Sequence, residues 1–226
     1  MPNVEDQNLT PATSGLVLHG AARYYDFMAW LMTRGREGDF REKVIDLARL
    51  KPGESVLDVG CGTGTLAIAA KRRVGPTGKV SGIDASLEMI ARASKKSRKA
   101  GVEVVFKNEV VEALPFPNAH FNAVLSTLML HHLPRKTREQ CAREMRRVLT
   151  PGGRVLAVDF GEAEREKSSL FAHFHHRHGR VKVADIIAML RGADLNIIES
   201  GAVGIRDLQF VLAMAPAVCE TNGSEL

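Results

Sequence analysis

From about residue 55 onward, short apolar runs alternate with longer segments whose apolar residues recur at the spacing of an α-helix. The short runs predict strands, and the longer segments predict helices between them. The predicted strands cover residues 56–59, 79–83, 102–106, 121–126 and 155–160. The intervening helices are expected at 65–74, 86–100 and 137–149. Such alternation is typical of an α/β domain, in which helices cover both faces of a parallel sheet.

The pattern changes after Phe160. Residues 161–182 are charged and rich in histidine, which favours an inserted cap segment. A helix is expected at 183–190, and the alternating segments 195–203 and 208–215 predict a final antiparallel strand pair. The complete sheet would then have seven strands, most of them parallel.

The beginning of the chain carries two further helical patterns. Aromatic and aliphatic residues at 21–33 predict an amphipathic helix that acts as a lid, after a flexible lead-in. Asp39 is placed to cap the next helix, which Pro52 and Gly53 end. We therefore expect a lead-in with a helical lid, a ligand-binding domain and a disordered tail, over residues 1–50, 51–216 and 217–226.

Composition and charge limit the classes of protein. The 226 residues are 45% hydrophobic and 25% charged, as in ordinary globular domains. No apolar run reaches the roughly 20 residues that span a bilayer, and the N-terminus lacks the pattern of a secretory signal. Cys61, Cys141 and Cys219 have no paired spacing, which favours a reducing cytoplasm. The net charge of +5 leaves peripheral contact with a lipid surface open, whereas a nucleic-acid partner is disfavoured because no dedicated module is recognisable.

The most informative stretch covers residues 56–66. A short apolar strand carries Asp58 near its end, alternate glycines follow, and a helix begins at about Thr65. Glycine has no Cβ, so a ligand can lie against bare backbone beside the free N–H groups at the start of the helix. The spacing Gly60-x-Gly62-x-Gly64 departs from the Gly-x-Gly-x-x-Gly fingerprint of dinucleotide-binding proteins.

Two acidic residues narrow the choice of ligand. Asp58 lies where a pyrophosphate would otherwise rest against the loop, and its charge repels phosphate and attracts a cation. Asp84 follows the second predicted strand, where a carboxylate can accept hydrogen bonds from both hydroxyls of a ribose. A ligand with a ribose and a positive charge but no phosphate is S-adenosylmethionine, which we expect as the cofactor.

With further motifs, this stretch resembles the class I S-adenosylmethionine-dependent methyltransferases, in the branch similar to the ubiquinone/menaquinone C-methyltransferases. The matching segments occur in the order of that family and cover residues 56–64, 82–86, 113–117, 121–124, 130–134 and 144–153. The resemblance implies a Rossmann-like fold and this cofactor. It says little about the molecule that receives the methyl group.

The resemblance also implies roles for individual residues. Asp58 would fix the loop and help to hold the methionine ammonium group. The methionine part would lie on the loop formed by Gly60, Cys61, Gly62 and Gly64, in which Cys61 is a small filler. Asp84 would bind the ribose hydroxyls, with Ala85 beside the adenine, and Thr127 would line the methionine end.

The adenine contact departs from the pattern of similar proteins. They carry an Asp or Asn four residues before the leucine of Leu-Pro-Phe, and this chain has Val110 there. The contact therefore falls either to the backbone of Val110 and Val111 or to the neighbouring Glu109.

Candidates for chemistry at the acceptor are Tyr25, His131 and His132. Tyr25 belongs to an aromatic group that resembles the element closing over cofactor and acceptor, although helix packing is the alternative. The two histidines follow the fourth predicted strand, where either would act as a base or both would form a structural turn. No metal site is expected, because the histidines of residues 173–178 have no fixed carboxylate or cysteine partner in the sequence.

The sequence thus predicts an enzyme that moves the S-adenosylmethionine methyl group to a small molecule by in-line displacement. An aromatic, quinone-like or other metabolite is the favoured acceptor, and a phospholipid head group at a membrane surface is the alternative. The alternative from another class is a non-catalytic S-adenosylmethionine-binding protein, which would keep the glycine loop but lack a competent acceptor pocket. An NAD-dependent dehydrogenase would share the sheet and Asp84 but should have the dinucleotide spacing.

Overall fold

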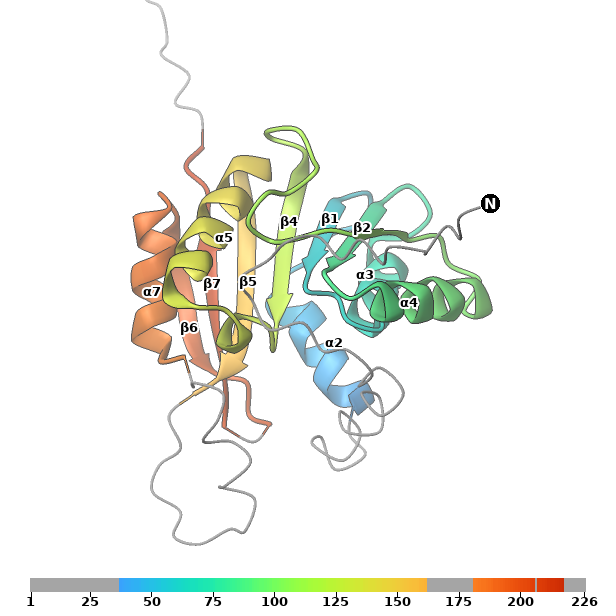
Figure 1. Ribbon diagram of the computed structural model, residues 1–226, viewed down its shortest axis with the longest axis horizontal. Helices are drawn as coiled ribbons and strands as arrows, with labels where there is room; N and C mark the ends of the chain where they lie inside the picture. Colours follow the sequence, from blue (N-terminus) through green and yellow to red (C-terminus); the bar gives the residue numbers. More distant parts are fainter. Residues whose placement is uncertain (1–36, 162–180, 206, 218–226) are drawn as a thin grey trace, which may run out of the picture.

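A single sheet runs through the middle of the protein (Figure 1). The computed structural model describes residues 37–161, 181–205 and 207–217. The seven strands lie in the order β3-β2-β1-β4-β5-β7-β6. Their bounds are β1 Ser55–Val59, β2 Lys79–Asp84, β3 Val105–Asn108, β4 Phe121–Thr127, β5 Leu149–Phe160, β6 Asn196–Ala202 and β7 Leu208–Met214. β1 to β5 are parallel, whereas β7 is antiparallel to both of its neighbours, so the predicted sheet is confirmed.

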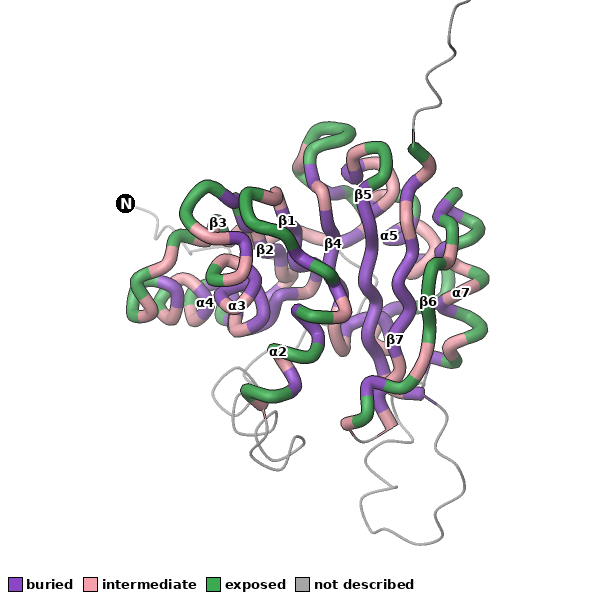
Figure 2. Tube along the Cα trace, turned by 180° about the vertical axis from the view of Figure 1, so that it is seen from behind, coloured by how far each residue is buried: buried purple, intermediate pink, exposed green. Residues whose placement is uncertain are grey.

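Helices cover both faces of the sheet, as Figures 1 and 2 show. The helices are α2 Glu37–Leu47, α3 Thr65–Val74, α4 Leu87–Lys99, η1 Leu130–His132, α5 Arg135–Val148 and α7 Val183–Gly192. α5 and α7 pack on one face in a core that includes Leu57 and Val59 of β1. α2 and α3 pack on the other face with Val56, and α4 lies beside α3. Side chains alternate along a strand, so β1 is buried on both of its faces.

Three details of the predicted elements needed correction. β3 is Val105–Asn108 and not 102–106; it is an edge strand, and Val105 is exposed, so burial does not mark its bounds. β5 already begins at Leu149, although its regular pairing with β4 starts only at Arg154. Asp39 lies inside the first turn of α2, where it cannot be the capping residue. Ser86, by contrast, caps α4 as expected, because its Oγ accepts from the Met89 N–H at 3.4 Å.

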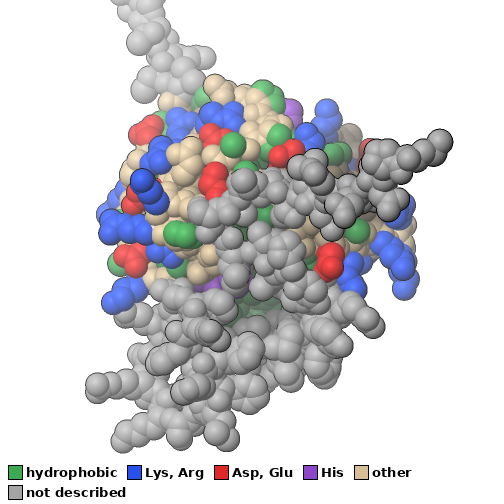
Figure 3. Space-filling model, in the orientation of Figure 1, with side chains coloured by type: hydrophobic (Ala, Val, Ile, Leu, Met, Phe, Trp, Pro, Cys, Tyr) green, Lys and Arg blue, Asp and Glu red, His purple; other side chains and the backbone are tan. Residues whose placement is uncertain are grey.

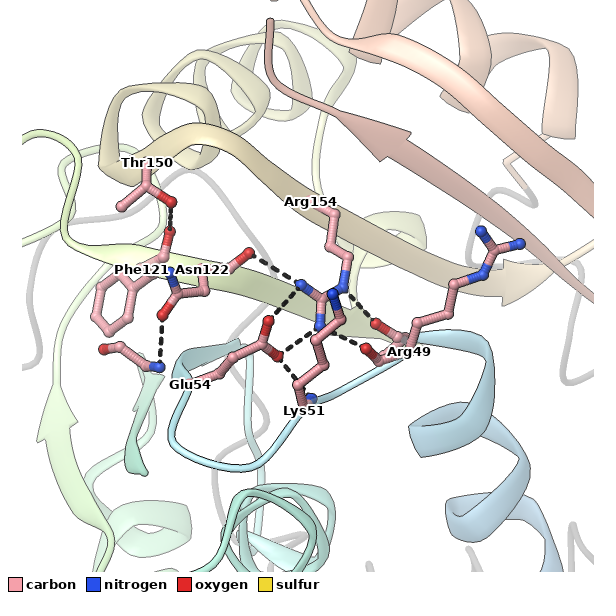
Figure 4. A network of polar contacts seen from close by, with 9 residues as sticks. Arg49, Lys51, Glu54, Phe121, Asn122, Thr150 and Arg154 are labelled. Carbon is pink, nitrogen blue, oxygen red and sulfur yellow. Dashed lines mark hydrogen bonds and ion pairs between the residues drawn. The ribbon is translucent and has the colours of Figure 1, made fainter. Parts of the chain in front are cut away.

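A buried arginine ties α2 to the sheet at the edge opposite the glycine loop (Figure 4). Arg154 of β5 donates to the carbonyls of Ala48 and Arg49, which follow α2, at 2.6 and 2.8 Å. The same guanidinium forms a bidentate pair with Glu54, at 2.9 and 2.6 Å. Burial acts to raise the pKa of Glu54, but the hydrogen bonds and charge of Arg154, with the Lys51 N–H, outweigh it and lower this pKa. The pair therefore satisfies carbonyls that a helix end leaves without partners.

Several predicted features fall on residues that the structure does not describe. They are the lid helix at 21–33 with Tyr25, the histidines of the cap segment at 173–178, and the tail from 218. Within the described ranges, no helix is long and apolar enough to cross a membrane.

Candidate functional site at the carboxyl edge of the sheet

The loop between β1 and α3 crosses the carboxyl edge of the sheet in a conformation that requires glycine. Gly60, Gly62 and Gly64 have φ angles of +72°, +52° and +76°, which other residues adopt only with strain. A Cβ on Gly60 would meet Met129 Cγ at 2.4 Å, and one on Gly64 would meet Ala93 Cβ and Phe106 Cζ at 2.7 Å. Both glycines are thus fixed by backbone angle and by space, and the loop leads directly into α3.

Asp58 lies next to the end of β1, directly before this loop, and is 2% exposed. Its carboxylate accepts the N–H of Ala67 in the first turn of α3, and its Oδ2 is buried without a hydrogen-bond partner among the described residues. Burial and the neighbouring charge of Asp84 raise the pKa of Asp58 to about 7. A buried carboxylate with one oxygen that lacks a hydrogen-bond partner is suited to a positively charged or hydrogen-bond-donating ligand.

Asp84 ends β2 and is only partly buried. Its Oδ2 accepts from the Gly62 N–H and its Oδ1 from the Ser86 N–H, both at 2.9 Å. The carboxylate therefore braces the glycine loop and still has lone pairs on both oxygens. Burial raises its pKa, while these two hydrogen bonds oppose the shift.

The residues expected around an adenine lie on the same edge. Ala85 follows Asp84, and the Glu109 N–H donates to the Asp84 carbonyl at 3.2 Å. Val110 and Val111 follow Glu109 just beyond the end of β3, and Val111 is buried. Sequence reasoning missed Asn108, whose Nδ2 donates to the same carbonyl at 2.9 Å and so joins the ends of β2 and β3. The only signal for Asn108 was its place two residues past the predicted strand.

Cys61 is buried within the glycine loop. Its N–H donates to the Ile83 carbonyl at 2.8 Å, and a Cβ on Gly82 would meet its sulfur at 3.0 Å. Burial, with the charges of Asp58 and Asp84, raises the pKa of this thiol. A protonated, enclosed thiol is a packing group and no nucleophile.

The chain turns sharply after β4. Thr127 ends the strand, and Leu128 has a φ of +55°, which is strained for a residue with a side chain. The turn places Met129 against Gly60, so the end of β4 packs on the glycine loop. Thr127 Oγ1 and the neighbouring Ser126 Oγ are buried and have no hydrogen-bond partner within the described part of the chain.

His131 and His132 are the last two residues of η1, which follows this turn. Their rings lie 3.9 Å apart between centroids. His131 Nδ1 lies 2.7 Å from Oδ1 of Asp159, a fully buried residue near the end of β5. Sequence reasoning missed Asp159, although it occupies the same position near a strand end as Asp58 and Asp84.

The structure therefore gathers the described members of the predicted site on one edge. Asp58, the glycine loop, Asp84, Thr127 and the histidine pair follow the carboxyl ends of β1, β2 and β4, which are neighbours in the sheet. Tyr25 lies outside the described residues. Among residues 37–161, 181–205 and 207–217, no group of three or more His, Cys, Asp or Glu could hold a metal ion.

Comparison with known proteins assigns the chain to a family. The methyltransferase domain family matches residues 56–153. The ubiquinone/menaquinone biosynthesis C-methyltransferase UbiE of Escherichia fergusonii is 33% identical over 174 residues, which cover 76% of this chain and 68% of that protein. The chain belongs to the class I S-adenosylmethionine-dependent methyltransferases, in the UbiE-like branch. The UbiE protein of Ralstonia pickettii is 36% identical to this protein over 70% of the chain, a match that spans 64% of that relative's own length, just under two thirds.

Solved structures share the fold of this protein. An S-adenosylmethionine-dependent methyltransferase from Aquifex aeolicus superimposes with a TM-score of 0.72 at 24% identity, over 88% of this chain and 99% of that one. The [4+2]-cyclase SpnF superimposes with a TM-score of 0.66 at 20% identity, over 78% and 80% of the two chains. Because the same fold carries a cyclase, it does not by itself specify the reaction.

The residues present fit the cofactor of this family. Oδ2 of Asp58, which is buried and unpaired among the described residues, suits a cationic ammonium group. The remaining lone pairs of Asp84 suit a pair of ribose hydroxyls. The glycines, which have no Cβ, leave the loop backbone bare between these two carboxylates. None of these features depends on a phosphate group in the ligand.

Proposed function

We propose that this protein transfers the methyl group of S-adenosylmethionine to a small aromatic, quinone-like acceptor. The observation that carries the proposal is the pairing of two carboxylates across the glycine loop, of which Asp58 is buried with an open oxygen and a raised pKa. A cationic ligand offsets the mutual repulsion of these carboxylates, whereas the negative charge of a pyrophosphate would itself be repelled by both of them. When bound, the cofactor supplies a methyl group on positively charged sulfur.

The residues of the carboxyl edge would bind different parts of the cofactor. Asp58 holds the ammonium group and Asp84 the ribose hydroxyls, while the methionine part lies on the backbone of Gly60, Cys61, Gly62 and Gly64. Ala85, Glu109, Val110 and Val111 surround the adenine, and Thr127 with its buried hydroxyl lines the methionine end. Most of the catalysis then comes from holding the acceptor in line with the methyl group.

One observation supports a quinone-like acceptor, and a second bears on the phospholipid alternative. The curated relatives that match are named for ubiquinone and menaquinone biosynthesis. On the face in Figure 3, Lys and Arg side chains lie over both ends of the molecule with Asp and Glu among them, so the described residues form no unbroken basic surface there. A lipid head group on an anionic membrane would be served by such a surface. We also propose a cytoplasmic location, because Cys61 and Cys141 are free thiols.

Transfer of a labelled methyl group tests the proposal. The purified protein is supplied with methyl-labelled S-adenosylmethionine and a short-chain demethylated benzoquinol or naphthoquinol, with phosphatidylethanolamine vesicles in a parallel reaction. We expect label in the quinol, and loss of at least ten-fold in kcat/KM for Asp84→Asn but not for Asp185→Asn on the exposed side of α7. Label only in the vesicles would move the acceptor to phospholipid, and no transfer to any acceptor would contradict the activity.

A further inference from the structure

His131 and Asp159 form a hydrogen-bonded pair that bridges the ends of β4 and β5. His131 Nδ1 lies 2.7 Å from Asp159 Oδ1. The Asp159 side chain is fully buried, whereas 11% of the His131 side chain remains exposed. Phe160 packs edge-on against the His131 ring, with centroids 5.3 Å apart, and the centroid of the His132 ring lies 3.9 Å from that of His131. The imidazole is therefore held on several sides but keeps an accessible part.

The hydrogen bonds of Asp159 determine which ring nitrogen of His131 carries the proton. The carboxylate accepts the His131 N–H on Oδ2 at 3.1 Å and the Phe160 N–H on Oδ1 at 2.8 Å. A carboxylate can only accept, so the third contact requires a proton on His131 Nδ1. In the neutral ring, Nε2 then has the free lone pair.

The pair is attached to the cofactor loop. The strained Leu128 turns the chain after β4, and Met129, two residues before His131, fills the space above Gly60. β4 also pairs with β1 next to Asp58, in the register Asp58↔Leu125 and Val59↔Ser126. Backbone strain of this kind is kept where it positions functional groups. The strained turn thus links the position of the histidine, through Met129, to the loop on which the methionine part would lie.

We propose that His131 is the base that takes a proton from the acceptor through Nε2, and that Asp159 is the positioning residue that sets its tautomer. This inference rests on the proposed methyl transfer. It also chooses between the two histidines, because Asp159 fixes the ring of His131.

With a quinol acceptor, His131 Nε2 takes the hydroxyl proton, and the oxygen electron pair moves through the quinol ring to form the carbon–methyl bond. The electrons of the broken carbon–sulfur bond stay on sulfur, which becomes neutral. The ring carbon then loses its own proton, and the oxygen recovers a proton from Nε2, so one proton is released overall.

Three variants separate the base from its support. His131→Ala removes the base, and we expect kcat with the benzoquinol to fall at least 100-fold while the Kd for S-adenosylhomocysteine stays within two-fold. Added imidazole should restore part of this kcat. Asp159→Asn should lower kcat at least ten-fold with the same unchanged Kd, because the amide must point an N–H at one of the donors around it. His120→Gln, on the exposed loop before β4, serves as the matched control and should keep the wild-type rate.

Nitrogen-15 spectra of the histidine rings test the positioning role without turnover. At a pH where the ring is neutral, His131 of the wild type should show protonated Nδ1 and bare Nε2, and Asp159→Asn should shift it toward the other tautomer. A protonated Nε2 in the wild type would overturn the role of Asp159. A kcat of His131→Ala within three-fold of wild type would overturn the role of His131. If no acceptor is methylated at all, the proposed function fails, and the spectra still decide the positioning claim.

Discussion

Asp58 is buried, lies near the like charge of Asp84, and has one oxygen without a hydrogen-bond partner among the described residues. Each of these properties affects ligand binding. Its pKa of about 7 in the free protein means that it holds a proton up to neutral pH. A ligand ammonium group favours the ionised carboxylate, so binding must release that proton below pH 7. We predict that the Kd for S-adenosylhomocysteine falls as pH rises from about 5.5 to 7, by at most ten-fold per pH unit. Calorimetry in buffers of different ionisation enthalpy measures the released proton.

Asp58→Asn provides the control for this pH dependence. The amide keeps an oxygen for the Ala67 N–H but cannot titrate, so the proton release and most of the pH dependence should disappear. A wild-type Kd that stays constant across this range would contradict the assignment of the ammonium group to Asp58.

The same carboxyl affects the stability of the unliganded protein. The pKa of Asp58 is raised from 3.8 to about 7 on folding, so the folded state favours the protonated form. Stability should therefore fall as pH rises from about 4 to 7, and the full penalty should be present above pH 7. We predict that Asp58→Asn raises the free energy of unfolding at pH 8, by up to roughly 4 kcal/mol, while it weakens cofactor binding. Urea denaturation at pH 4 and pH 8 measures this, and a lower stability of the variant at pH 8 would contradict it.

At the scale of the element, the glycine loop depends on space as well as on backbone angle. Gly64 and Gly101 both have a positive φ, +76° and +65°, but of the two only Gly64 has neighbours within reach of an added Cβ. We predict that Gly101→Ala costs about 1–2 kcal/mol of unfolding free energy from backbone strain alone. Gly64→Ala should cost roughly 1–3 kcal/mol more, because Ala93 and Phe106 must move. Equal losses in urea denaturation would show that the Gly64 neighbours adapt freely.

The clamp between β5 and α2 is a second element that mutation can test. Arg154 is buried against Glu54 and the carbonyls that follow α2, whereas Arg49 pairs with Glu199 at the exposed surface. Arg154→Met leaves Glu54 without its partner, and we predict a loss of about 3–5 kcal/mol of unfolding free energy. Arg49→Met should change it by no more than about 1 kcal/mol. Similar losses for the two variants in urea denaturation would contradict the structural role of Arg154.

At the scale of the whole molecule, local pattern predicted which elements form but not how they meet. Alternation of apolar runs located the strands, because parallel strands are buried on both faces, and it located Asp58 and Asp84 near their ends. The bounds of β3 were wrong because an edge strand has an exposed face and so a weaker pattern. The order in which β7 lies between β5 and β6 is a property of long-range pairing, which no local period records.

The same limit applies to the site. His131 was a candidate from its motif, but its partner Asp159 lies 28 residues further along the chain and meets it only because β4 and β5 pair. The contact of Met129 with Gly60 likewise depends on the strained turn at Leu128. Residues near strand ends can be predicted as members of one edge, whereas the contacts between them need the fold.

The central claim is that the edge formed by Asp58, the glycine loop and Asp84 binds a phosphate-free, cationic adenosine compound. Calorimetric titration with S-adenosylhomocysteine and with NAD tests it most directly. We predict one saturable site for S-adenosylhomocysteine, weakened at least ten-fold by Asp84→Asn and unchanged by Asp185→Asn, with no binding of NAD. Saturable binding of NAD together with no heat from S-adenosylhomocysteine would contradict the claim.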